Sequence, residues 1–315
     1  MKIVKDDVKK YAIGVDIGGT KILLMITNRL GEVIHKKKVD STGELNLILK
    51  IIDSFLEEAN IGLNEILGMG IGVPGEINSL EGIVRISVQM GWKDTNIKEF
   101  FSNRYAFPVY IKNDVNFSAL GERWIGNGDN SDNLVYISIG TGVGGAIIAN
   151  GHLIEGHNFS AGELGYIVDK DDFNKESIND LEGFGSLEKK ISGHSLTQQV
   201  SEIGLMPEEL FIEFMKGNQT AIDIIEHFIR DLSIVIANLV STLNPEVVII
   251  GGGVSESMHC IIDQIITCVN RLTIFPINIK LSKLGGEAGA YGCIYYVFFE
   301  AVKNKTETLK SVSSK

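Results

Sequence analysis

Two glycine-rich turns between apolar segments constrain the fold of this chain most. The segment "AIGVDIGGTKILLMIT" at residues 12–27 has an apolar run, a turn at Gly18 and Gly19, and a second apolar run. The segment "VYISIGTGVGGAIIA" at residues 135–149 repeats this arrangement. Short apolar runs bounded by glycine are typical of buried β-strands. The repetition therefore predicts two related domains, each beginning with strand, glycine turn and strand.

The segments after each turn follow a similar order. Strands are expected in the first half, then a helix over 45–60 with apolar residues at helical spacing, then strands at 67–75 and 107–114 and a helix over 115–126. The second half repeats the pattern with a long helix over 219–243, strands at 245–253 and 278–286, and a helix over 256–272 between these two strands. We expect an α/β fold of two related domains with a cleft between them. The expected domains are residues 1–118 plus 294–315, and residues 119–293.

Composition excludes several classes of protein. The net charge of −11 over 315 residues argues against a nucleic-acid partner, which requires a basic surface. No apolar run approaches the roughly 18 residues of a membrane span. The three cysteines show no C-x-x-C spacing and cannot all pair, and the first ten residues are too charged for a signal peptide. We expect a cytoplasmic protein that binds no membrane.

The segment "GTGVGG" at residues 140–145 matches G-x-G-x-x-G literally. In a dinucleotide-binding protein this turn opens a helix, whose N-terminus holds the pyrophosphate. Here an apolar, strand-like run follows at residues 146–149, which disfavours a nicotinamide cofactor. The sequence also contains no G-x-x-x-x-G-K-[ST] motif of the P-loop NTPases.

Both turns are instead interpreted as cradles of backbone N–H groups for phosphate, with plain hairpin turns as the alternative. A third glycine run ends the apolar segment "PEVVIIGGG" at residues 245–253 and favours the phosphate interpretation. Asp16 would repel a phosphate unless a cation lay between them. It is therefore expected to hold Mg²⁺, directly or through water.

These motifs together resemble the sugar kinases of the ROK family, which have the actin-like ATPase (ribonuclease H-like) fold. The likeness covers roughly residues 11–300 and includes "DIGGTK", "ISIGTGVGGAII" and "NPEVVIIGGGVSE", together with "GVPGEI", "NDVNFSALGE", "AGELG" and "GSLE" on the sugar side. The likeness implies binding of ATP with Mg²⁺. The residues implied to bind the nucleotide are Asp16, Gly18, Gly19, Thr20, Lys21, Gly140, Thr141, Gly142, Gly144, Gly252 and Gly253.

The same resemblance implies a catalytic base at Asp114, where a carboxylate can take the proton of an attacking hydroxyl. It implies sugar contacts at Gly75, Asn113, Glu163 and Glu188. For the "ND" pair the alternative is a helix cap, and both roles can hold at once. For the two glutamates the alternative is a solvated surface acid.

One segment departs from the family pattern. The positions at which the family carries a His and three Cys of a structural zinc site hold Tyr166, Asn179, Leu181 and Ser186. Such side chains cannot form a tetrahedral N/S site, so we predict that the protein contains no zinc. A small apolar cluster of Phe173, Leu181, Phe184 and Leu187 is expected to order residues 167–190 instead. Phe159 also stands where the family has a glycine.

The predicted function is an ATP-dependent sugar kinase. It would transfer the γ-phosphoryl group to the primary hydroxyl of a hexose, glucose first, or of an N-acetylhexosamine. The alternative is a sugar-sensing regulator without catalysis, since the family also contains repressors with an N-terminal helix-turn-helix. The first phosphate motif begins near residue 13, which is expected to leave no room for such a domain. The expected partners are a sugar, ATP and a second copy in a homodimer.

Overall fold

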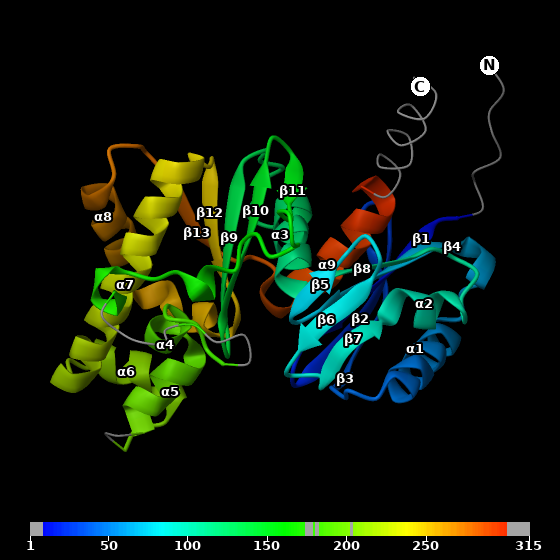
Figure 1. The fold of residues 1–315 in the computed structure, drawn as a ribbon, viewed down its shortest axis with the longest axis horizontal. Helices are drawn as coiled ribbons and strands as arrows, with labels where there is room; N and C mark the ends of the chain where they lie inside the picture. The colour runs from blue at the N-terminus through cyan, green and yellow to red at the C-terminus, as the bar shows by residue number, and fades with distance from the viewer. Residues whose placement is uncertain (1–8, 174–178, 180–182, 202–203, 301–315) are drawn as a thin grey trace. The chain divides into compact units, whose positions relative to one another are not determined.

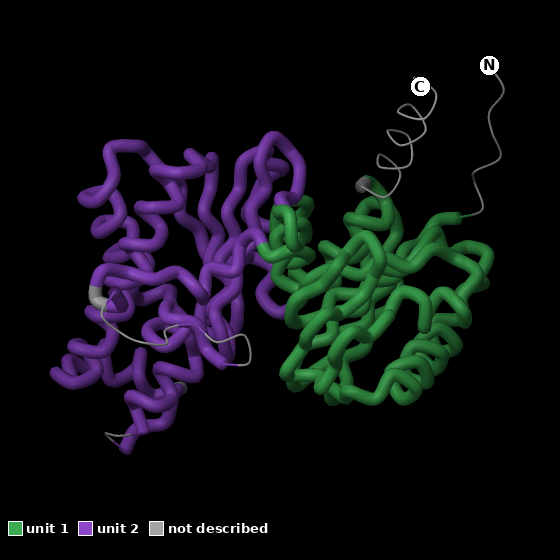
Figure 2. Tube along the Cα trace, in the orientation of Figure 1, with its two compact units in different colours: residues 1–125, 156–160, 287–315 green, residues 126–155, 161–286 purple. Residues whose placement is uncertain are grey.

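The computed structural model describes residues 9–173, 179, 183–201 and 204–300 (Figure 1). The chain divides into two compact units (Figure 2). Unit 1 contains residues 1–125, 156–160 and 287–315, and unit 2 contains residues 126–155 and 161–286. The domain boundaries expected from the sequence fall inside α3 (Asp114–Ile125) and α9 (Ala288–Tyr295), which this division keeps whole in unit 1.

Unit 1 is built on a five-stranded sheet in the order β3-β2-β1-β4-β8. The first three strands are antiparallel, and β4 and β8 join β1 in parallel. Their bounds are β1 Tyr11–Ile17, β2 Lys21–Asn28, β3 Val33–Asp40, β4 Ile66–Val73 and β8 Val109–Asn113.

Helices cover both faces of this sheet because successive side chains on a strand point to opposite faces. Leu24 of β2 packs into a core with α1 (Leu45–Ala59) and α2 (Ile97–Ser102). Its neighbours Leu23 and Met25 pack instead against α9 and the π-helical turn that follows it (Tyr296–Glu300). Within the described residues, α9 and the turn that follows it thus complete the core of unit 1.

A second sheet of three antiparallel strands in unit 1 was not predicted from the sequence. It consists of β5 (Glu76–Asn78), β6 (Ile83–Ser87) and β7 (Trp92–Asn96).

Unit 2 repeats the topology of the main sheet of unit 1. Its strand order is β11-β10-β9-β12-β13, again with three antiparallel strands and two that join in parallel. The bounds are β9 Leu134–Ile139, β10 Val143–Ala149, β11 His152–Ile154, β12 Val247–Gly251 and β13 Asn278–Leu281. The predicted repeat of two related α/β halves is confirmed, and with it the fold class.

The helices of unit 2 follow the predicted pattern with one difference. The long helix α7 (Gln219–Leu243) begins where Asn218 Oδ1 accepts the N–H groups of Thr220 and Ala221, and ends at Asn244 in a left-handed conformation. The helix expected from residue 256 is a 3₁₀ segment (Gly253–Cys260) followed by α8 (Ile262–Leu272). The remaining helices are α4 (Glu188–Ile191), α5 (Gly193–Ser201) and α6 (Leu210–Met215).

Candidate functional site

Two acidic residues lie close together at the carboxyl ends of the parallel strands in unit 1. Asp16 of β1 is paired with Gly72 of β4, and Asp114 directly follows β8. A Cβ atom at Gly72 would lie 3.2 Å from Asp16 Oδ1 and 3.4 Å from the Cα atom of Asp114. The missing side chain of Gly72 therefore leaves room for both acids. Open α/β sheets bind ligands at this end of their strands.

The surroundings of the two acids disfavour the ionised forms of both carboxyl groups. A Cβ atom at Gly289, near the start of α9, would lie 2.5 Å from Asp16 Oδ2. Burial, and then the negative charge of Asp114, raise the pKa of Asp16 to about 8, although Lys38 lowers it. Burial also raises the pKa of Asp114 to about 6, against hydrogen bonding from the backbone of Val115. Two neighbouring carboxyl groups disfavour each other's ionisation, and carboxylate oxygens are ligands that Mg²⁺ prefers. The donor set at Asp16 therefore fits this ion.

Asn113 caps the helix that carries Asp114. Its Oδ1 atom accepts the N–H groups of Val115 at 2.9 Å and Asn116 at 3.2 Å. Its Nδ2 atom donates to the carbonyl of Gly75 at 3.1 Å. Gly75 has a φ of 113°, and a Cβ atom there would lie 2.2 Å from the carbonyl oxygen of Ile86, so glycine is required. The cap interpretation of "ND" is thus observed, and the sugar contacts of Asn113 and Gly75 stay predictions.

The first glycine turn is a tight and exposed hairpin. The N–H of Gly18 donates to the carbonyl of Lys21 at 2.9 Å, and Gly19 and Thr20 are exposed. Lys21 Nζ pairs with Asp40 at 2.5 Å, and both side chains are largely exposed. In the described structure this lysine therefore sits in a surface ion pair beside the turn.

The second glycine turn is held by the start of α5. The carbonyl of Gly140 accepts the N–H of Gly193 at 2.7 Å, and the carbonyl of Thr141 accepts the N–H of His194 at 3.3 Å. Within the turn, the N–H of Gly140 donates to the carbonyl of Gly142 at 3.0 Å. This turn is shorter than the sequence predicted, because β10 begins at Val143 rather than at residue 146.

Glu188, at the start of α4, contacts this second turn directly. Its Oε1 atom accepts the N–H of Val143 at 2.8 Å, and its Oε2 atom accepts the N–H of Gly185 at 2.8 Å. A Cβ atom at Gly142 would lie 2.3 Å from Glu188 Oε1. Glu188 is therefore not only a solvated surface acid. It joins the segment expected on the sugar side to the turn expected to bind phosphate.

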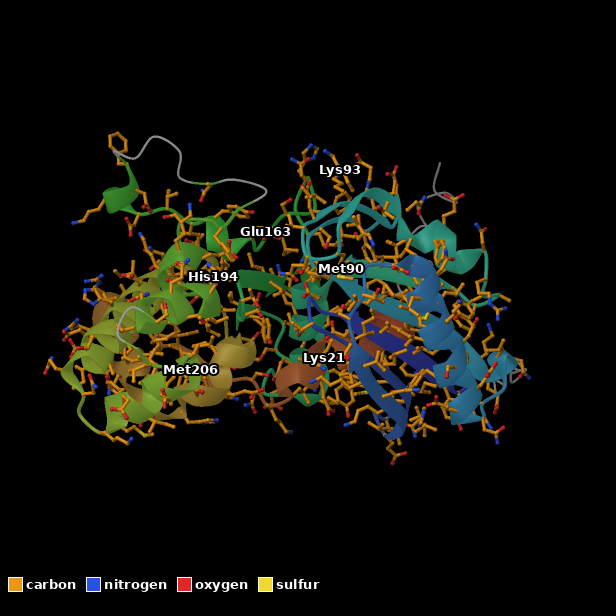
Figure 3. The ribbon with its side chains drawn as sticks, turned by 90° about the horizontal axis from the view of Figure 1, so that it is seen from below. Lys21, Met90, Lys93, Glu163, His194 and Met206 are labelled. Carbon is orange, nitrogen blue, oxygen red and sulfur yellow. The ribbon has the colours of Figure 1, made fainter. Side chains whose placement is uncertain are left out.

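The other predicted residues of unit 2 lie on neighbouring segments. Gly252 follows β12, and a Cβ atom there would lie 2.5 Å from the carbonyl oxygen of Ile139 at the end of β9. At Gly253 a Cβ atom would meet nothing within 4 Å. Glu163 is exposed and precedes a single 3₁₀ turn (Leu164–Tyr166) (Figure 3).

The expected apolar cluster near residues 167–190 is wrong. The side chain of Phe173 is 86 % exposed, Phe184 stacks on His194 with ring centroids 4.6 Å apart, and Leu187 is buried in the main core of unit 2. Leu181 lies outside the described residues. Polar contacts around Asp172 order the described part of this segment instead, as set out below.

The predicted site residues are divided between the two units. Asp16, Gly18, Gly19, Thr20, Lys21, Gly75, Asn113 and Asp114 belong to unit 1, and Gly140, Thr141, Gly142, Gly144, Glu163, Glu188, Gly252 and Gly253 belong to unit 2. Sequence reasoning missed Gly72 and Gly289, which make room for the acids. Their only signal was the dense glycine spacing of "GMGIGVPG" and "GGEAGAYG".

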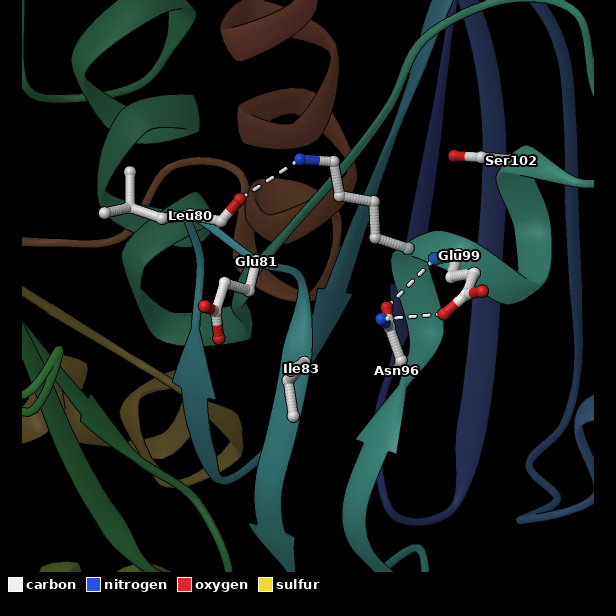
Figure 4. Close-up of a pocket in the computed structure, with 7 residues that line it drawn as sticks. Leu80, Glu81, Ile83, Asn96, Glu99 and Ser102 are labelled. Carbon is white, nitrogen blue, oxygen red and sulfur yellow. Dashed lines mark hydrogen bonds between the residues drawn. The ribbon is translucent and has the colours of Figure 1, made fainter.

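Unit 1 also contains a hollow (Figure 4). It lies between the β5–β6 hairpin and α2, where Lys98 Nζ donates to the carbonyl of Leu80 and Asn96 bonds to Glu99. None of the predicted site residues lines it.

The described part of the chain lacks two features, a membrane-spanning helix and a cluster of metal-ligating side chains. No helix there is both long enough and apolar enough to span a membrane. The same residues contain no group of three or more His, Cys, Asp or Glu side chains arranged to hold a metal ion.

Comparison with known proteins adds the following findings. The model of the ROK family matches residues 12–298. A glucokinase from Halalkalibacterium halodurans is 28 % identical over 308 residues, covering 90 % of this chain and 93 % of that protein. A xylose repressor from Caldicellulosiruptor bescii is 30 % identical, covering 90 % of this chain and 77 % of the repressor. The crystal structure of a ROK family glucokinase from Streptomyces griseus in complex with glucose and AMPPNP superposes with a TM-score of 0.75 at 26 % identity, covering 90 % of this chain and 98 % of that one.

Proposed function

Because the chain belongs to the ROK family, we propose that it is an ATP-dependent sugar kinase with Asp114 as its catalytic base. The observation that carries this proposal is the position of Asp114. It lies at the carboxyl end of a parallel strand, beside Asp16, on a helix capped by Asn113. A carboxylate whose pKa is raised to about 6 is still ionised at neutral pH and is a better proton acceptor than an ordinary aspartate.

In this proposal each group has a defined task. Asp114 accepts the proton of the primary hydroxyl as that oxygen attacks the γ-phosphorus. Asn113, fixed by its bonds to Gly75 and to the start of α3, orients the sugar. Glu163 and Glu188 accept hydrogen bonds from other hydroxyls, since a polyol offers many donors and a carboxylate only accepts.

The glycine turns supply backbone N–H groups toward the phosphates, and Asp16 would hold Mg²⁺. When bound, Mg²⁺ would supply positive charge that offsets the negative charge developing on the phosphoryl group. A cation beside Asp16 would lower the pKa of this carboxyl group, which burial and the charge of Asp114 raise. Asp16 would then be ionised at neutral pH.

Glucose is the first substrate to test, in line with the glucokinases among the relatives. An N-acetylhexosamine is the second. The test is ADP release, measured with a panel of hexoses and N-acetylhexosamines, for the wild type and for Asp114→Asn. We expect turnover with at least one sugar and a loss of ~10²–10⁴-fold in kcat for Asp114→Asn, with ATP affinity unchanged.

Asp223→Asn, at an exposed acid of α7, is the matched control and should retain full turnover. Turnover of Asp114→Asn within a few-fold of wild type would refute the assignment of the base.

A second candidate function is a sugar-sensing regulator, favoured by the 30 % identity to a xylose repressor over most of this chain. Calorimetry with the same sugars separates the two functions. Sugar binding with no ADP release from any sugar in the panel would favour the regulator.

A further inference from the structure

A buried acid in unit 2, Asp172, is the centre of a polar network that the proposed function does not use. Its side chain is 1 % exposed. The Oδ2 atom accepts the N–H of Asp169 at 3.1 Å, the hydroxyl of Ser186 at 2.5 Å and the ammonium of Lys190 at 3.3 Å. A buried carboxylate is strongly unfavourable unless it is paired and hydrogen-bonded, and here both conditions are met.

Lys190 provides the balancing charge. Its ammonium group also pairs with the more exposed Asp169 at 2.5 Å. Partial burial lowers the pKa of Lys190, but the hydrogen bonds to Asp169 and Asp172 outweigh it and the net shift is upward. Lys190 therefore stays charged when the network forms.

Asn179 extends the network to a third segment. Its Nδ2 atom donates to the carbonyl of Tyr166 at 2.9 Å, and its Oδ1 atom accepts the N–H of Ser186 at 2.8 Å. Ser186 is thus held from two sides, by its N–H and by its hydroxyl. Together Asp172, Asn179, Ser186 and Lys190, which we call the Asp172 network, join residues 166–172 to residues 186–190.

Two members of the Asp172 network, Asn179 and Ser186, and the adjoining Tyr166 occupy positions at which the family pattern places zinc ligands. Tyr166 contributes its backbone carbonyl to the network, Asn179 its amide and Ser186 its hydroxyl and N–H. Thiolate and imidazole groups are absent from all three positions, and the polar atoms face each other in hydrogen bonds. The residues present do not fit a structural zinc ion.

The Asp172 network leads directly to Glu188. Ser186 lies between Gly185, whose N–H donates to Glu188 Oε2, and Leu187, whose N–H donates to the carbonyl of Gly165 at 3.0 Å. Glu188 Oε1 in turn accepts the N–H of Val143 at the second glycine turn. Fixing Ser186 therefore fixes the backbone on which the Glu188 carboxylate stands.

We propose that Asp172 is a positioning residue, and that the Asp172 network takes the place of a metal clamp in holding Glu188 against the Val143 N–H. The link from this network to catalysis rests on the proposed sugar kinase function. In that setting one carboxylate both accepts sugar hydroxyls and fixes the turn that faces the phosphates. Loosening the network should therefore weaken both sites through Glu188.

The test compares Asp172→Ala, Asp172→Asn and Ser186→Ala with the control Asp169→Asn. The control removes only the more exposed partner of Lys190. Hydrogen exchange at the Val143 amide is the first readout, and it requires no turnover. We expect exchange roughly tenfold faster or more in Ser186→Ala and Asp172→Ala, a smaller change in Asp172→Asn, and little in the control.

A double-mutant cycle with Glu188→Gln is the second readout. If Asp172 acts through Glu188, its substitution should add little to the sugar KM and to Val143 exchange once Glu188 is changed. Additive effects, or Val143 exchange equal to wild type in folded Ser186→Ala and Asp172→Asn, would overturn the proposal. Should Asp172→Ala fail to fold, those two milder variants decide the result.

Elemental analysis and chelation give the third readout. We expect no stoichiometric zinc, and unchanged Val143 exchange after dialysis against EDTA. One tightly held zinc per chain, with faster exchange on its removal, would show that a metal holds this segment. Absence of turnover in the wild type would refute the kinase function alone, because the exchange measurements would still report on the network.

Discussion

Substituting Gly292 by alanine should separate two helices that pack unusually closely in unit 1. A Cβ atom at Gly292 of α9 would lie 1.6 Å from the carbonyl oxygen of Phe117 in α3. The facing glycine shows the reciprocal constraint, since a Cβ atom at Gly121 would lie 2.1 Å from the carbonyl oxygen of Ala288. Cβ contacts under 3.0 Å are essentially never found, so the helices must move apart by about 3.0 − 1.6 = 1.4 Å or more.

Two opposing effects set the size of the change in stability. Alanine is favoured over glycine inside a helix by ~1 kcal/mol. Overpacking of a core costs about 1–3 kcal/mol, and the upper value applies here because the obstacle is a backbone carbonyl rather than a flexible side chain. We therefore expect a net loss of about 2 kcal/mol in the free energy of unfolding.

The same movement should impair turnover. The helix α3 begins at Asp114, and α9 begins beside the Asp16 carboxylate at Gly289. A shift of the helices thus changes the spacing of the two acids, and a displacement of ~1 Å at a reacting group can cost ~10²-fold in rate.

Urea unfolding and ADP release measure the two effects of Gly292→Ala. The control is Gly286→Ala, where a Cβ atom would meet no atom within 4 Å. A stability within ~0.5 kcal/mol of wild type together with unchanged kcat would refute the reasoning, since that is the range of neutral surface substitutions.

Three further outcomes are expected. Since Asp114 must be ionised to accept a proton and its pKa is raised to about 6, kcat/KM should be level above that pH and fall about tenfold per unit below it; a pH profile that stays flat down to pH 5 would contradict this. Gly142→Val should weaken both ATP and sugar binding, because its side chain would displace the Glu188 carboxylate 2.3 Å away; calorimetry that finds a loss for only one ligand would contradict the link. Gly289→Ala should raise the Mg²⁺ concentration needed for half-maximal turnover, because its Cβ atom would press on the Asp16 carboxylate; a Mg²⁺ titration identical to that of the glycine control above would contradict it.

The main sheets were predictable because local pattern and glycine turns specify them. Each half begins with two long apolar runs. The short glycine turn between them predicts that the two strands form a β-hairpin. The β5–β7 sheet lacked such a signal. Its strands have three to five residues, and "WKDTN" contains more polar than apolar side chains. Its pairing depends on neighbouring strands and contacts such as the Arg85–Glu76 ion pair, which a local pattern does not reveal.

The part of the candidate site that lies at the ends of predicted strands could be predicted from the sequence. The carboxyl ends of neighbouring parallel strands lie at one edge of the sheet, which is why Asp16 near the end of β1 and Asp114 after β8 lie together. The glycine beside Asp16 at position 289 could not be placed, because it comes from the other end of the chain. Phe159 is a different case: its φ of 62° lies in the left-handed region, which favours the glycine that the family resemblance implied at this position.

The segment after residue 166 could not be read from apolar residues at all. Phe173 is exposed, while the neighbouring Asp172 is buried. From hydrophobicity alone one would expect the phenylalanine to be buried and the aspartate to be exposed. A buried acid is tolerated only where distant donors converge on it, here Ser186 and Lys190, and sequence alone does not bring them together.

In each unit an acid lies near the glycine turn, but the two acids come from different elements of the fold. Asp16 stands one residue before the end of β1, and Ser138 has the matching place one residue before the end of β9. Unit 2 therefore has no acid in the strand itself, and the carboxylate beside its turn comes from Glu188 of α4. On the proposed function this difference has a physical reason. An uncompensated carboxylate beside a phosphate turn would repel the phosphate, and in unit 1 a cation at Asp16 would offset that charge. The Glu188 charge is offset by two backbone N–H groups, so this acid can stand next to a phosphate turn without a metal ion of its own.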